Sequence, residues 1–233
     1  MPKNVFEKFE LASERGQWQE ALAIVDRLTV RAALRNDVKL LLNALAHRCH
    51  VFKHFWQQSA NNLFLDLFRD DIQAGLNIAV RRRVSGQPLA VLQLRLGDYF
   101  DYTGDRKRAE QWYRKAIVTL GAAALPGERG EYQGHYFLAL YKNGKVGRAR
   151  TAAEQAFANV SRDRTLRPWH RLILLSGLHM RRAQGEISTG RRAAAVPDLA
   201  AARSLASELK RTYGMGMRMV QLGMLKKQLN FKQ

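Results

Sequence analysis

One stretch of this chain, residues 90–120, has a pattern typical of two short helices packed against each other. Apolar side chains recur at helical spacing up to residue 100, and a second stripe begins at Ala109. Between the stripes, Gly104 and Asp105 predict a turn and a helix cap, because glycine adopts left-handed backbone angles and aspartate accepts hydrogen bonds from free helical N–H groups. Gly97 and Ala109 are small where the helices should cross, which allows a close approach. The stretch therefore predicts an antiparallel helix pair.

This pattern resembles a tetratricopeptide repeat (TPR), a helix-turn-helix unit of about 34 residues. The positions that match the family are Leu96, Gly97, Phe100, Gly104, Asp105, Ala109, Tyr113 and Ala116. Gln93 replaces the family's early Trp, and Gly121 replaces its closing Pro. A single unit cannot bury its apolar face without neighbours. The resemblance therefore implies an all-α fold, a right-handed α-solenoid of antiparallel helix pairs.

Further helix pairs align with this one along the chain. Apolar stripes flank Gly16 and Gly144 as they flank Gly104. A more divergent copy is expected to turn near Gly185 and to resume near Pro197, because proline suits the first turn of a helix. We therefore expect one domain over residues 1–233, with helix pairs at approximately 2–30, 34–84, 88–120, 131–160 and 168–212 and a C-terminal capping helix at 216–230. The pair at 34–84 lacks the family's small-residue pattern and is interpreted as a divergent hairpin.

The charge of the chain is large and uneven. The formal net charge is +19, and residues 72–233 hold 29 Lys and Arg against 11 Asp and Glu. Such a field attracts polyanions, and clustered arginines contact phosphates or carboxylates with two hydrogen bonds at once. The alternative interpretation is that these side chains only form solvated helix faces. The candidate polyanion-binding residues are Arg81, Arg82, Arg83, Arg106, Lys107, Arg108, Arg148, Arg150, Arg181 and Arg182.

The resemblance also implies a groove, lined by the first helix of each pair, that binds a protein segment. The groove positions that it implies are Val91, Leu94, Asp98, Asp101, Tyr102, Leu138 and Tyr141. These residues depart from the family's variant that holds a C-terminal carboxylate with Lys, Arg and Asn. We therefore do not expect that binding mode.

The sequence offers little for catalysis. It has no phosphate-binding Gly-rich loop, no Cys-x-x-Cys and no Gly-x-Ser-x-Gly motif, so no catalytic residue and no cofactor are predicted. His47, His50 and His54 share one helix face and form a weak metal candidate, although such histidines more often fill polar positions at a helix interface. A single Cys49 excludes an internal disulfide, and no apolar run approaches the roughly 18 residues that span a membrane, so a cytoplasmic location is expected.

Two functional hypotheses follow. The first is a non-catalytic adaptor whose groove binds a protein partner, with the basic surface attracting an acidic or nucleic-acid-containing partner. The second is a helical-repeat protein that binds RNA or DNA directly and without sequence preference, through its phosphates. Attachment to a membrane surface is not expected, because no basic helix in the sequence pairs its charges with a free apolar face.

Overall fold

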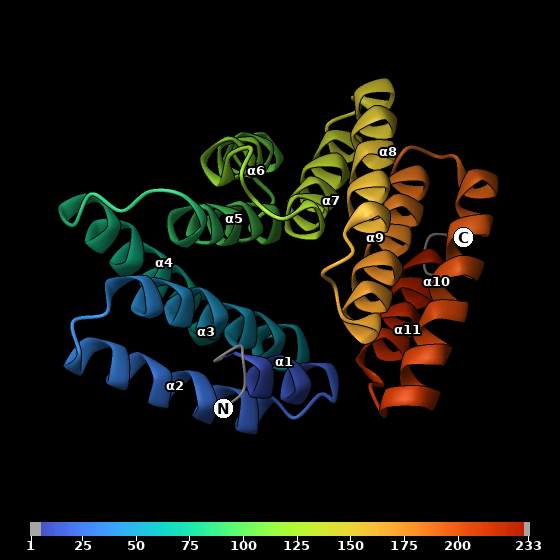
Figure 1. The fold of residues 1–233 in the computed structure, drawn as a ribbon. Helices are drawn as coiled ribbons and strands as arrows, with labels where there is room; N and C mark the ends of the chain where they lie inside the picture. The colour runs from blue at the N-terminus through green and yellow to red at the C-terminus, as the bar shows by residue number, and fades with distance from the viewer. Residues whose placement is uncertain (1–5, 231–233) are drawn as a thin grey trace. The chain divides into compact units, whose positions relative to one another are not determined.

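The computed structural model of the protein describes residues 6–230, and of residues 228–230 it describes only the backbone. These residues form eleven helices and no strand (Figure 1), which confirms the predicted all-α helical-repeat fold. The chain divides into two compact units, residues 1–122 and residues 123–233. None of the described helices combines the length and the apolar character needed to cross a bilayer. That the whole chain forms a single domain stays a prediction.

The first unit contains six helices, of which each packs against the next along the chain, and α3 also packs against α5. Their bounds are α1 (Glu7–Glu14), α2 (Trp18–Leu34), α3 (Val38–Ser59), α4 (Asn62–Arg81), α5 (Gln87–Tyr102) and α6 (Arg106–Leu120). One buried cluster joins α3 and α4 through Cys49, Phe52 and Phe68. A second cluster joins α3, α4 and α5 through Leu42 and Leu92 among others.

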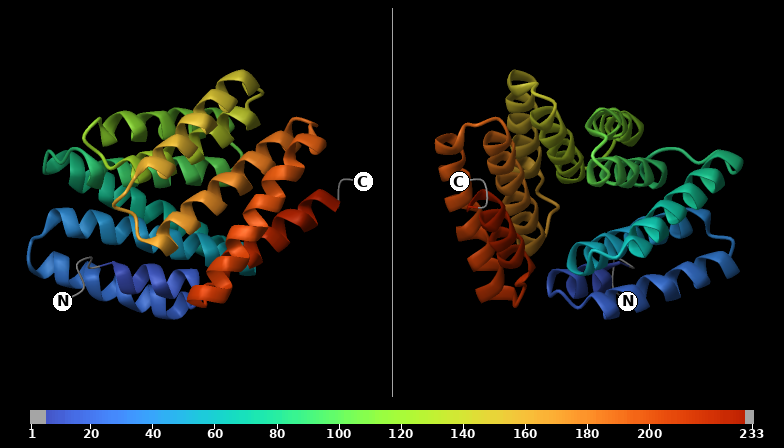
Figure 2. Two further views of the ribbon diagram at one scale, coloured as in Figure 1. Left: turned by 45° about the vertical axis from the view of Figure 1, so that its right-hand side comes forward. Right: turned by 180° about the vertical axis from the view of Figure 1, so that it is seen from behind.

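The second unit contains the remaining five described helices. Their bounds are α7 (Pro126–Lys142), α8 (Val146–Arg162), α9 (Pro168–Ser188), α10 (Arg192–Tyr213) and α11 (Met217–Asn230). In this unit α7 packs against α8 and α9, and α9 packs against α10 and α11 (Figure 2). One buried core of this unit lies between α7, α8 and α9 and includes Phe137, Leu140 and Ala153. In both units, alternate helices therefore touch as well as consecutive ones, as the stacking of helix pairs requires.

The pair α5–α6 has the geometry that the sequence predicts. Gly104 adopts a φ of 86°, which a side chain would oppose. The Asp105 side chain accepts a hydrogen bond of 3.1 Å from the backbone N–H of Arg108 and caps α6. A Cβ at Gly97 would lie 2.5 Å from the ring of Tyr113. The small residue therefore permits the close crossing of the two helices.

Two predicted turns are placed differently. Gly185 lies inside α9, where a Cβ would lie 2.3 Å from the Tyr141 ring, so this glycine permits a close approach of α7 and does not form a turn. The turn follows at Gly190, whose φ is 81°. Helix α10 begins at Arg192, so Pro197 stands inside it and not in its first turn. Proline is tolerated there because Ala193, whose carbonyl is left without its helical N–H partner, is exposed, so water can bond that carbonyl.

The boundary of the divergent pair also differs from the prediction. Leu34 was expected to open the pair at 34–84, but it is the last residue of α2. The turn comes at Asn36, with a φ of 51°, and the Asp37 side chain caps α3 by accepting a hydrogen bond from Leu40. The beginning of the first predicted pair, residues 2–5, lies outside the described residues.

Candidate functional site

The predicted groove positions on α5 are largely filled by the protein's own packing. Asp98 is 2% exposed, accepts a 2.9 Å hydrogen bond from the Tyr113 hydroxyl and forms an ion pair with Arg95. Val91 and Leu94 are also buried. The expectation that Leu94 and Asp98 line an open groove is therefore wrong, because Asp98 holds α5 and α6 together. The spacing of three residues between Arg95 and Asp98 could have indicated this ion pair.

Asp101 and Tyr102, in the last turn of α5, remain partly accessible to solvent. Both are half-buried, and the Tyr102 ring packs against Trp56 and Phe68 with ring centroids 5.6 and 6.4 Å apart. Their contact with a partner stays a prediction.

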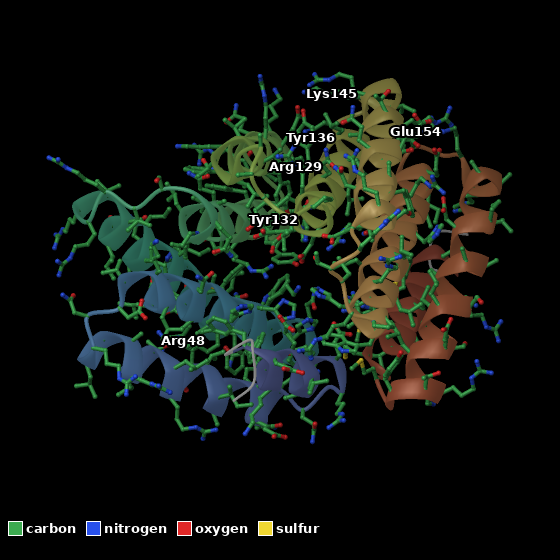
Figure 3. All side chains as sticks on the ribbon, viewed as in Figure 1. Arg48, Arg129, Tyr132, Tyr136, Lys145 and Glu154 are labelled. Carbon is green, nitrogen blue, oxygen red and sulfur yellow. The ribbon has the colours of Figure 1, made fainter. Side chains whose placement is uncertain are left out.

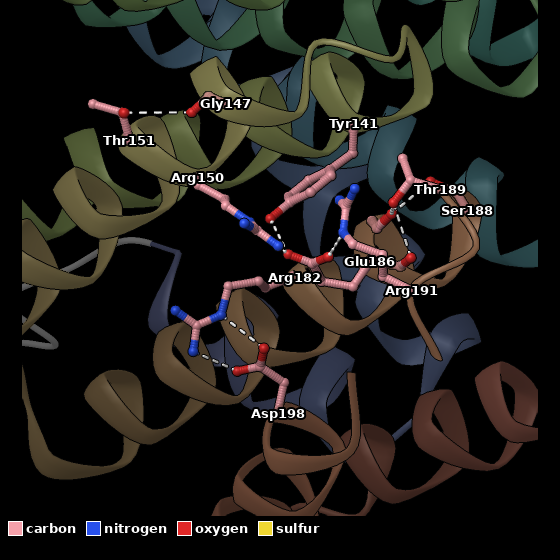
Figure 4. Close-up of polar contacts among 11 residues, drawn as sticks. Tyr141, Gly147, Arg150, Thr151, Arg182, Glu186, Ser188, Thr189, Arg191 and Asp198 are labelled. Carbon is pink, nitrogen blue, oxygen red and sulfur yellow. Dashed lines mark hydrogen bonds and ion pairs between the residues drawn. The ribbon is translucent and has the colours of Figure 1, made fainter. Parts of the chain in front are cut away.

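On α7, Tyr141 is buried and belongs to a polar network around Glu186. The Tyr141 hydroxyl donates a 2.7 Å hydrogen bond to Glu186, and Arg150 and Arg191 donate to the same carboxylate (Figure 4). Although burial alone would raise the pKa of Glu186, these hydrogen bonds lower that pKa below its ordinary value. Burial and the Glu186 hydrogen bond raise the pKa of Tyr141 to about 12. Tyr141 is therefore not an open groove position, while Leu138 remains half-buried against the core.

A second network lies around Asp198 of α10. Arg182 donates two hydrogen bonds to its carboxylate, at 2.7 and 2.6 Å (Figure 4). His179 Nδ1 lies 2.7 Å from the same carboxylate. The Arg182 guanidinium also stands over the Phe157 ring at 4.5 Å. Although burial would raise the pKa of Asp198, the hydrogen bonds from His179 and Arg182 lower it. This bidentate pair joins α9 to α10.

These networks correct the list of candidate polyanion-binding residues. Arg182 and Arg150 neutralise buried carboxylates, and Arg181 lies 2.7 Å from the ring of His135. A buried carboxylate needs such partners, because removing it from water is costly. The sequence showed that Arg181 and Arg182 are adjacent, but it did not show which carboxylates the arginines face. Arg148 is exposed, and it donates a hydrogen bond of 3.1 Å to Tyr136.

The remaining candidates are exposed and fall into two groups within the first unit. Arg81, Arg82 and Arg83 lie at the C-terminal end of α4, while Arg106, Lys107 and Arg108 begin α6. Helix α5 separates the two groups, and its 16 residues span about 24 Å at 1.5 Å per residue. The two groups therefore do not form one cluster.

The three histidines on α3 pack against aromatic rings. The ring of His47 lies 4.4 Å from that of Phe6, and the ring of His54 stacks on Trp18 at 3.9 Å. His50 also packs against Trp18, and desolvation lowers its pKa. No group of three or more metal-ligating side chains with suitable geometry occurs among the residues that the structure describes. The three imidazoles therefore contribute to the interface of α1, α2 and α3.

An ion pair that the sequence did not indicate ties three helices of the first unit together. Arg48 of α3 lies between α2 and α3 (Figure 3) and donates a hydrogen bond of 2.6 Å from Nε to Asp71 of α4. It also contacts Asp26 of α2 at 3.4 Å. Asp26 and Asp71 are 22 and 23 positions from Arg48 in the sequence, so the spacing of residues within one helix could not reveal these contacts.

Solved structures with a similar arrangement of helices are repeat proteins. One is a protein of Podosopora anserina described as a kinesin light chain with nearly identical TPR-like repeats. Its TM-score is 0.52 and its sequence identity is 19%, and the match covers 89% of this chain and 96% of that chain. Another is BtubC (BKLC) of P. vanneervenii, with a TM-score of 0.58 and 17% identity, covering 87% of this chain and 78% of that one. No family model matches the sequence, and no curated protein matches it.

The protein is therefore a TPR-like helical-repeat protein by its fold, as the resemblance of residues 90–120 predicts. Stacked helix pairs of this kind present extended surfaces, which serve in general as scaffolds for contacts between proteins.

Proposed function

We propose that the protein is a non-catalytic, cytoplasmic adaptor that binds an acidic protein segment, or an assembly containing one, through its helical-repeat surface and its exposed cations. The observation that carries this proposal is the contrast between paired and unpaired arginines. Arg48, Arg95 and Arg182 are matched to carboxylates inside the units. Arg81 and Arg83, in contrast, are exposed, and their side chains have no hydrogen bond or ion pair with any described residue.

The charge balance of the second unit supports the same proposal. Residues 123–233 hold 20 Lys and Arg against seven Asp and Glu, a net charge of +13. Three of the seven acids, Asp163, Glu186 and Asp198, are buried and bond residues of their own unit. Few carboxylates are left to offset the exposed cations, so a partner with negative charge gains from this surface.

Direct binding of RNA or DNA is the alternative function, and the exposed group at the start of α6 favours it. The Lys107 side chain has no hydrogen bond or ion pair with any described residue, and Arg106 and Arg108 flank it in the exposed first turn of α6. Cations in such a position contact phosphates without reading bases.

Two binding measurements on the purified, nuclease-treated full chain distinguish the two functions: one with peptides and one with nucleic acids. A displayed library of random peptides is selected in near-physiological salt, and binding of labelled RNA and DNA is measured at low and near-physiological salt. The adaptor proposal expects enrichment of acidic peptides, and nucleic-acid binding that disappears as salt increases.

The opposite result would favour the alternative. Micromolar or tighter binding of RNA or DNA in near-physiological salt, lost on Arg106→Gln/Lys107→Gln/Arg108→Gln, together with no enriched peptide, would refute the adaptor proposal.

A further inference from the structure

The two most exposed large apolar side chains of the described residues lie at the ends of α2 and α4. Leu34, the last residue of α2, is 84% exposed, and Val80, in the last turn of α4, is 77% exposed. Single exposed apolar side chains are common and need no explanation. Two of them at one end of a unit, flanked by cations, suggest a surface that is covered by a partner.

The turns that follow α2 and α4 are bridged by a side-chain hydrogen bond. Arg82 Nη2, just after α4, donates a hydrogen bond of 3.3 Å to Asn36 Oδ1, just after α2. Val38 and Val84, which follow these turns, pack against the same buried cluster. Both turns lie on the left of Figure 1 and on the right of the rear view in Figure 2.

The two turns also have the same backbone geometry. Asn36 and Arg83 adopt φ values of 51° and 52°, and each is followed by a residue whose N–H bonds a carbonyl five positions earlier. Both ends are therefore closed by hydrogen bonds, which hold the flanking side chains on an ordered backbone. We call this surface the turn-end patch. Its residues are Arg31, Leu34, Arg35, Val80, Arg81 and Arg83.

The four arginines of the turn-end patch have no internal role in the described structure. They are exposed, and none of their side chains has a hydrogen bond or ion pair with a described residue. The acid nearest in sequence, Asp37, accepts a hydrogen bond from Leu40 as the cap of α3. A cation in the last turn of a helix is favoured by the helix dipole, which accounts for Arg31 and Arg81. It also favours Arg35 and Arg83, which stand at or directly after the helix ends, but it does not account for the two apolar side chains.

We propose that the turn-end patch binds an acidic, amphipathic peptide segment of the partner protein. Carboxylates of the segment would pair with the four arginines, and aliphatic side chains of the segment would cover Leu34 and Val80. This inference rests on the proposed adaptor function and adds the place and the chemistry of binding. A bare phosphate backbone would use the arginines but would leave both apolar side chains in water, so a peptide fits the patch better than a nucleic acid does.

The test uses two labelled synthetic peptides and the full chain. One peptide carries glutamate with leucine on one helical face, and the other carries serine in place of leucine. The patch variants are Leu34→Ser/Val80→Ser and Arg35→Gln/Arg83→Gln. The matched controls are Val118→Ser/Val196→Ser, at positions 73% and 61% exposed, and Arg114→Gln/Arg203→Gln, both exposed. Because all these side chains are exposed, the variants should fold, and circular dichroism verifies this.

The proposal expects the leucine peptide to bind at least about tenfold more tightly than the serine peptide, and each patch variant to weaken its binding about tenfold or more. The controls should change it by less than about twofold. Equal binding of the two peptides, or equal losses in patch and control variants, would overturn the proposal. If the leucine peptide binds but the patch variants bind it normally, the adaptor function survives and the turn-end patch is the wrong site.

Generic RNA and vesicles of phosphatidylserine and phosphatidylcholine are measured in the same series. If a patch variant loses binding to RNA or vesicles and keeps binding to the leucine peptide, the patch is assigned to that other ligand and the proposal is refuted.

Discussion

Replacing Gly97 with alanine tests whether the crossing of α5 and α6 depends on the missing side chain. The new Cβ would lie 2.5 Å from two carbons of the Tyr113 ring, whereas carbon atoms pack best at about 3.5–4.0 Å. The ring cannot simply turn away, because Tyr113 is 3% exposed and its hydroxyl donates to the buried Asp98. Either the two helices separate or the hydrogen bond to Asp98 breaks.

The magnitude follows from three contributions. Overpacking a buried crossing costs about 1–3 kcal/mol, and loosening a buried hydrogen bond costs about 1–3 kcal/mol. Alanine is preferred to glycine inside a helix by about 1 kcal/mol, which acts in the opposite direction. We therefore expect Gly97→Ala to lower the free energy of unfolding of the first unit by about 1–5 kcal/mol.

The assay is urea unfolding followed by tryptophan fluorescence in a Trp169→Phe background. The remaining tryptophans, Trp18, Trp56 and Trp112, all belong to the first unit, so the signal reports its unfolding alone.

A second background makes the test decisive. In Tyr113→Ala protein the ring is gone, so alanine at position 97 should cost nothing and should stabilise by up to about 1 kcal/mol. If Gly97→Ala costs the same in both backgrounds, or costs less than about 0.5 kcal/mol in the parent, the close-crossing argument is wrong.

Three further predictions concern stability. Gly223 lies in the middle of α11, where an added Cβ would meet open space. Gly223→Ala should therefore stabilise the protein by about 0.5–1 kcal/mol and raise the midpoint of thermal unfolding, and an unchanged or lower midpoint would contradict this. Arg48→Met should lower the urea stability of the first unit by about 2–4 kcal/mol, because the buried Asp71 carboxyl group loses its bidentate partner. A loss below about 1 kcal/mol would refute that role. Desolvation lowers the pKa of His50 below its ordinary value of 6.5, so near and below pH 6.5 the unfolded chain binds more protons than the folded one. The free energy of unfolding should therefore be constant above about pH 6.5 and fall as the pH drops below that value. Urea midpoints measured across this pH range should fall less steeply in His50→Gln.

The helices and several turns could be predicted from the sequence because their causes are local. The spacing of Leu92, Leu96 and Tyr99 places one stripe on a helix, and Gly104 with Asp105 determines where that helix ends and the next begins. These effects act within about one or two helical turns, so one segment contains the whole signal. The excess of basic residues is likewise a property of composition.

The candidate site depended on contacts that composition and spacing do not contain. Gly185 resembles a turn residue in the sequence, yet it lies in α9 against Tyr141, which is 44 positions away. Arg182 looks like another surface cation until Asp198 is seen to accept both of its hydrogen bonds.

The sequence by itself therefore determined the helix pairs and the sign of the charge, and only the tertiary structure decided which cations remain free. The physical reason is that a buried carboxylate takes its partners from whatever helices pack around it, as Glu186 takes Arg150 from α8, 36 residues earlier. The turn-end patch follows the same rule, because the turns that follow Leu34 and Val80 are joined by the Arg82–Asn36 hydrogen bond only after α2, α3 and α4 have packed. Packing thus decides which of the many cations pair with carboxylates inside the protein and which stay exposed.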